Sequence, residues 1–128
     1  MRVRAFATAV IVLSAAAFQA CSSDTSGPDG GDPPDFGDDV VITLTASTFS
    51  PKEVTIDAGE RVHWYNSSGV LHNVTPDDPD QEGVWSAFSS SASNPDGSYT
   101  FTVAGQVYEY HCTLHVGMTG KITVRPAT

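Results

Sequence analysis

From Val40 to the C-terminus, hydrophobic and polar residues follow one another in short runs. β-Branched and aromatic residues recur at every second position, as in Ser98–Val103, and Gly, Pro, Asn and Asp separate the runs. A period of two is typical of strands that bury one face. The pattern predicts strands over residues 40–45, 54–56, 61–65, 72–75, 98–103, 107–112 and 121–124.

The spacing of these runs predicts the fold class. Seven or eight short strands with turn residues between them favour an all-β sandwich, and no helix longer than one or two turns is indicated. Phe49–Pro51 is expected to be a break between the first two predicted strands. Residues 76–97 are mostly polar, and we expect Trp85 and Phe88 to hold this long stretch against the core.

The first 39 residues have a different pattern. Residues 5–20 carry no charge and follow Arg2 and Arg4, which predicts a secretory signal over residues 1–20 that is too short to span a membrane comfortably. Ala20–Cys21 resembles the cleavage site of bacterial lipoproteins, whose cysteine is lipidated. Ordinary cleavage near Ala20 and an uncleaved anchor are the alternatives. Six Asp and very few apolar residues predict a flexible acidic tether over residues 21–39.

These patterns divide the chain into a lipoprotein-type signal peptide, a tether and one domain over residues 40–128. The expected location is the bacterial periplasm or cell surface, with a lipid on Cys21 as the one contact with a membrane. The formal charge of −9, with six Lys and Arg, argues against nucleic acid as a partner. The two cysteines are too few for a disulfide framework or a four-thiolate metal cluster.

A group of potential metal ligands lies near the C-terminus. Cys112, His115 and Met118 are spaced three residues apart. A thiolate, an imidazole and a thioether form a soft ligand set that favours copper over Mg, Ca or Mn, whereas zinc would not favour the thioether. A blue-copper site needs a second imidazole. The candidates are the remaining histidines, and His72 directly follows a loop, at the start of a predicted strand.

Further motifs accompany this group. They are Val62-x-Trp64-x-Asn66, His72-Asn73, Gly105-x-x-Tyr108-x-Tyr110-x-Cys112 and Gly117-Met118-x-Gly120-x-Ile122. Together with Cys112-x₂-His115-x₂-Met118 they resemble the cupredoxin family, and the short ligand loop is most similar to that of the amicyanin type. The resemblance covers approximately residues 40–125.

The resemblance implies a Greek-key β-sandwich of about eight strands with one type 1 copper per chain. It implies that His72, Cys112 and His115 are the equatorial ligands and that Met118 is the axial ligand. It also implies that the backbone N–H of Asn73 points at the Cys112 sulfur. Leu71 and Leu114 stand where the family often has proline before its ligand histidines, which affects the expected rigidity of the loops and the reduction potential.

The function implied is that of an electron carrier and not of an enzyme. The partner would be a redox protein, either a cytochrome or a copper or other oxidoreductase enzyme, bound transiently by a monomer. Apolar loop residues are expected to surround the edge of His115 as the docking face. They are Gly69, Val70, Leu71, Leu114, Val116 and Gly117. The acidic run 77–82 is either a solvated loop or a patch that steers a basic partner.

Other functions stay open at this point. The domain could buffer or deliver copper, or it could be a metal-free adhesion sandwich. His111 is expected to face outward, because Tyr110 and Cys112 alternate inward. It could be a solvated side chain or an electron exit, or it could hold a second copper in a multi-subunit enzyme. For His63 a surface role is the default expectation.

Overall fold

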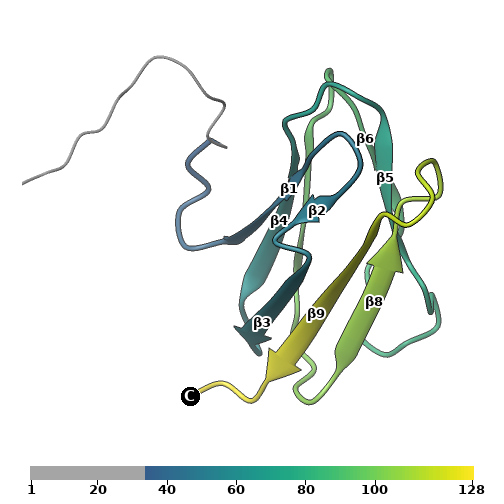
Figure 1. Ribbon diagram of the computed structural model, residues 1–128. Coiled ribbons are helices and arrows are strands. Elements are labelled where there is room, and N and C mark those ends of the chain that lie inside the picture. Colours follow the sequence, from purple (N-terminus) through teal and green to yellow (C-terminus); the bar gives the residue numbers. More distant parts are fainter. Residues whose placement is uncertain (1–33) are drawn as a thin grey trace, which may run out of the picture. The chain divides into compact units, whose positions relative to one another are not determined.

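The computed structural model describes residues 34–128, and within that range nine strands form two sheets (Figure 1). The predicted signal segment, Cys21 and the predicted tether up to residue 33 lie outside the described residues. The strands are β1 (Val40–Leu44), β2 (Phe49–Ser50), β3 (Glu53–Asp57), β4 (Arg61–Asn66), β5 (His72–Pro76), β6 (Phe88–Ser90), β7 (Asp96–Thr100), β8 (Val107–His111) and β9 (Thr119–Arg125). Over residues 34–128 there is no helix, and therefore none that could cross a membrane.

The two sheets have the orders β2-β1-β4-β7 and β3-β9-β8-β5-β6. β1 pairs in parallel with β4, and β3 pairs in parallel with β9, while the other neighbours are antiparallel. The prediction of an all-β sandwich of about eight strands is confirmed, and all seven predicted strand regions contain a strand. The additional strands, β2 and β6, are only two and three residues long.

Two segments differ from the expectation. Phe49 and Ser50, expected within a break, pair with Leu44 and Thr43 of β1. The strand expected over residues 98–103 lies instead at Asp96–Thr100. Phe101 leaves the sheet because its N–H donates to the Glu60 carbonyl at 3.0 Å and its carbonyl accepts from the Gly59 N–H at 2.7 Å. Phe101, near the end of the predicted strand, is therefore hydrogen-bonded to the turn before β4 and not to a neighbouring strand.

The core is a cluster of aromatic rings between the sheets. Trp64 lies at its centre, with ring centroids 5.1 Å from Trp85, 5.7 Å from Phe88 and 5.8 Å from Tyr110. Trp85 is buried and donates its indole N–H to the Val74 carbonyl at 3.3 Å. The prediction that Trp85 and Phe88 hold the long polar stretch to the core is confirmed. Burial raises the pKa of the Tyr110 hydroxyl, which therefore stays neutral.

The residues directly before β1 contact the start of β4. The Phe36 ring stacks on the His63 ring with centroids 3.6 Å apart. The hydrogen bond from the Arg61 guanidinium holds the pKa of Asp39 below its usual value. His63 lies between the carboxylates of Asp39 and Asp96, at 3.3 and 3.1 Å. His63 is thus partly covered rather than simply solvated, and the last residues of the predicted tether lie against the domain.

The close approach of β8 and β9 yields a test of the packing. Gly120 of β9 lies opposite Tyr110 of β8, and a Cβ at position 120 would overlap the Tyr110 phenol ring. We expect Gly120→Ala to lower the free energy of unfolding by about 1–3 kcal/mol, because the buried ring has to move. The exposed neighbour Thr119→Ala is the matched control, with an expected change within about 0.5 kcal/mol. Denaturant titration measures both, and equal effects would contradict the close packing.

Candidate metal centre

Two neighbouring strands bring the predicted ligands to one end of the sandwich. His72 is the first residue of β5, and Cys112 directly follows β8. β5 and β8 are antiparallel neighbours, with Thr75 opposite His111, so that the start of β5 lies near the end of β8. Tyr108 and Tyr110 of β8 are fully buried, and Cys112 continues their inward alternation. The thiol therefore points into the sandwich, beside the start of β5.

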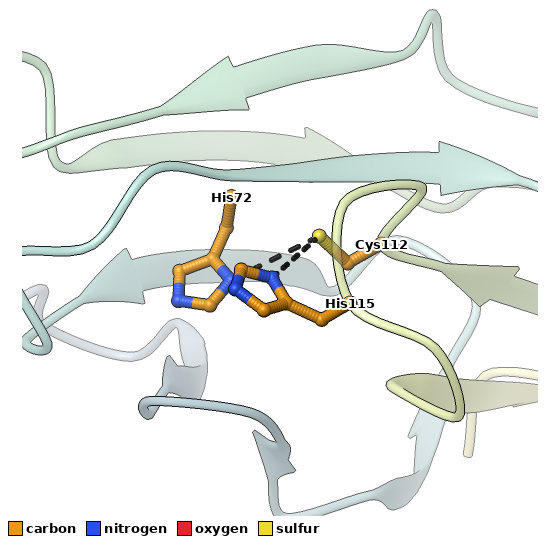
Figure 2. Close-up of side chains that lie close together, drawn as sticks. All are labelled: His72, Cys112 and His115. Carbon is orange, nitrogen blue, oxygen red and sulfur yellow. Dashed lines mark hydrogen bonds between the residues drawn. The ribbon is translucent and has the colours of Figure 1, made fainter.

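His72, Cys112 and His115 point toward one another in this region (Figure 2). The Cys112 Sγ lies 3.8 Å from Nδ1 of His72 and 3.4 Å from Nδ1 of His115. Two ligands that bind one ion at about 2.0–2.3 Å lie about 3.5 Å apart, so this spacing fits a single metal. Within residues 34–128 these three form the one group of three or more His, Cys, Asp or Glu side chains whose donor atoms converge.

The surroundings keep His72 ready to bind a metal. Its side chain is fully buried, and this desolvation lowers the pKa of the imidazole. The nearby His115 lowers it further, while the Thr45 backbone carbonyl acts in the opposite direction. His72 is therefore neutral at pH 7, as a metal ligand must be. His115 is half-buried and lies closer to the solvent.

Asn73 joins the two loops of the centre. Its backbone N–H points at the Cys112 Sγ at 3.5 Å, as the family resemblance implied. Its side-chain amide donates to the Thr113 hydroxyl at 2.6 Å and accepts from the Thr113 N–H at 2.9 Å. The sequence reasoning missed this second contact, since two polar residues 40 positions apart give no signal of pairing. Both residues directly follow a predicted ligand, which is the one hint that the chain offers.

Met118 closes the ligand loop and is buried. The Cys112 N–H donates to the Met118 carbonyl at 3.0 Å, and the Met118 N–H donates to the His115 carbonyl at 3.1 Å. These bonds fold residues 112–118 into a tight turn, so that all three members of the motif belong to one compact element. Met118 thus lies in the same group as the other three predicted ligands, and its axial role stays a prediction.

The other two histidines do not join the group. His111 faces outward on β8, where its Nδ1 contacts the Asp77 carboxylate. This confirms the predicted alternation of β8. His63 is at the start of β4 and is enclosed by the acidic side chains described above. A second copper site at His111 stays an untested hypothesis.

Apolar side chains lie on the loops that carry the two histidines. Val70 and Leu71 precede His72, while Leu114 and Val116 flank His115, and all four are exposed to solvent. Exposed large apolar residues that cluster in this way often mark a binding surface. The predicted apolar patch is therefore present at the loops of the metal centre.

Comparisons with known proteins agree with this geometry. The family model described as copper-binding proteins of the plastocyanin/azurin family matches residues 39–125. An amicyanin of Paracoccus versutus is 37% identical over 91 residues, which is 68% of this chain and 65% of that protein. The match thus spans slightly less than two thirds of that relative. A plastocyanin of Scenedesmus fuscus is 37% identical over 99 residues, which cover 68% of this chain and all of that protein.

A solved structure of Paracoccus versutus amicyanin has a similar fold. It superposes with a TM-score of 0.56 at 34% sequence identity and covers 68% of this chain and 81% of its own. A solved structure of a reduced amicyanin variant has a TM-score of 0.56 at 28% identity and covers 67% of this chain and 81% of its own. The fold and the ligand motif therefore point to the same group of proteins.

Proposed function

The chain belongs to the plastocyanin/azurin family of copper-binding proteins, and on this premise we propose that it carries single electrons between redox proteins through one type 1 copper. The ligands would be His72, Cys112 and His115, with Met118 in the axial position. The proposal rests on the convergence of the two imidazoles and the Cys112 thiol, two of them buried and His115 half-buried, with Met118 buried in the same loop.

The chain's own residues account for the properties that a carrier needs. Copper bound by this set supplies a one-electron Cu(II)/Cu(I) couple. The soft Cys112 and Met118 sulfurs suit Cu(I), and the two imidazoles suit Cu(II). The Asn73 N–H at the Cys112 Sγ stabilises negative charge on that sulfur and thereby adjusts the reduction potential. His115, as the less buried imidazole, is the route by which electrons enter and leave.

The apolar patch of Val70, Leu71, Leu114 and Val116 is the proposed docking surface. A carrier has to release its partner after each transfer, and transient redox encounters use small interfaces. The patch lies on the loops that hold His72 and His115, so a partner seated there approaches the copper closely. We propose that this partner is a cytochrome or a copper or other oxidoreductase enzyme, and that the carrier acts as a monomer.

We further propose that the protein is exported and held at a bacterial membrane by a lipid on Cys21. The support is the N-terminal pattern, in which an uncharged segment follows two arginines and ends at Ala20–Cys21. The direction of β1 is compatible with this. Val40 pairs with Val62 at the start of β4, whereas Leu44 pairs with Asn66 next to the metal-centre loops. The N-terminal end of β1 thus lies away from the metal-centre loops.

The visible spectrum tests the copper site directly. We expect residues 34–128 to give an intense thiolate-to-Cu(II) charge-transfer band when Cu(II) is added, and Cys112→Ser to abolish it. Met118→Gln should retain copper and lower the reduction potential, because an amide oxygen replaces the thioether. His111→Ala is the control, which should leave the band unchanged because this residue points away from the centre. A wild-type protein without the band would contradict the proposal.

Electron self-exchange tests the docking surface without knowledge of the partner. We expect Leu114→Glu to slow self-exchange, measured by NMR line broadening, by about tenfold or more, because a desolvated carboxylate costs at least about 1.4 kcal/mol at the contact. Val107→Glu is the matched control. Val107 is 45% exposed, compared with 53% for Leu114, and lies at the other end of β8. Equal slowing in both variants would show that net charge, and not the patch, controls the encounter.

A further inference from the structure

The buried His72 ring has a hydrogen-bond partner on the side that faces away from Cys112. Its Nε2 lies 3.1 Å from the Ser68 hydroxyl oxygen, while its Nδ1 faces the Cys112 Sγ. Nδ1 thus faces the metal pocket and Nε2 faces the loop before β5, and the Thr45 backbone carbonyl described above also acts on this ring and is unchanged in every variant below. In a neutral imidazole only one of them carries a proton, and the other has the free lone pair that binds a metal.

The orientation of Asn66 settles how the protons are placed in this loop. Asn66 is buried, and its amide nitrogen lies 2.6 Å from the Val70 carbonyl and 3.2 Å from the Ser90 carbonyl. Both of these partners only accept hydrogen bonds, so this atom must be the NH₂ group. The remaining atom of the amide is therefore the carbonyl Oδ1, which only accepts. It lies 2.7 Å from the Ser68 hydroxyl.

The Ser68 hydroxyl has one proton, and the 2.7 Å bond to Asn66 Oδ1 uses it. The same hydroxyl oxygen also accepts from the Val70 N–H at 3.1 Å. Toward His72 it can then only accept, so Nε2 of His72 must be the protonated nitrogen. The free lone pair is left on Nδ1, on the side of the Cys112 thiol.

We propose that Ser68 is a positioning residue that fixes the proton of His72 on Nε2 and thereby presents Nδ1 to copper. The inference rests on the proposed function in so far as the metal is copper. The position of the proton on His72 follows from hydrogen bonds within the protein and does not depend on which metal binds. Hydrogen bonds of this kind orient a ligand histidine and raise its basicity, and their loss typically lowers metal affinity about 10–100-fold.

The loop contains its own matched control. The hydroxyl of the preceding residue, Ser67, lies 3.5 Å from the Leu44 carbonyl and makes no hydrogen bond to His72 in the structure of residues 34–128. Ser67→Ala therefore removes a hydroxyl from the same turn and leaves the hydrogen bonds of Ser68 with Asn66 and His72 in place. Ser68→Thr retains the hydroxyl and is the conservative rescue variant.

Two measurements on the full chain test the proposal. Long-range ¹H–¹⁵N spectra of the reduced, metal-free protein report which nitrogen of His72 carries the proton. We expect protonated Nε2 in the wild type, in Ser67→Ala and in Ser68→Thr, and a mixture of both tautomers in Ser68→Ala. Competition for Cu(I) with a chromophoric chelator should show about tenfold weaker binding for Ser68→Ala only.

The outcomes separate this inference from the proposed function. A wild-type His72 protonated on Nδ1 would overturn it without any variant, as would equal Cu(I) affinity in Ser68→Ala and wild type. In either case, a normal charge-transfer band would still support the proposed copper site. A wild type that lacks the band would instead refute the proposed function, while the tautomer in the metal-free protein still decides the role of Ser68.

Discussion

The hydrogen bonds of Asn73 with Thr113 are the interaction on which the geometry of the centre depends. They join the start of β5 to the turn after β8, which are far apart in the chain, and so set His72 beside Cys112. The bonds from the Asn73 N–H to the sulfur and from the Cys112 N–H to the Met118 carbonyl then orient the thiol and close the loop. The sandwich makes β5 and β8 neighbours, and these few polar contacts fix the positions of His72 and Cys112 relative to each other.

The alternation along the strands made much of this predictable. The period of two in β8 puts Tyr110 and Cys112 inside and His111 outside, and the structure agrees, because a buried face of this kind allows only one register. The close spacing of Cys112 and His115 also made their proximity predictable, since residues in one short loop cannot be far apart.

Other features could not be predicted, because they depend on contacts between distant residues. Phe101 leaves its strand to bond with the turn at Gly59, and Phe36 stacks on His63, although the surrounding composition is that of a tether. The role of Ser68 follows from the orientation of the Asn66 amide, which no local pattern encodes. Local periodicity thus predicts which way a side chain faces, while contacts between residues far apart in the chain determine its partners.

We infer that the protein itself holds the three donor atoms together, so that copper enters a site that already exists. Crystal structures of the metal-free and the copper-loaded protein test this most directly. We expect His72, Cys112 and His115 to keep the same rotamers in both structures and the Asn73–Thr113 bonds to be unchanged. A metal-free structure in which His72 has left the pocket, or in which the Asn73–Thr113 bonds are broken, would contradict it.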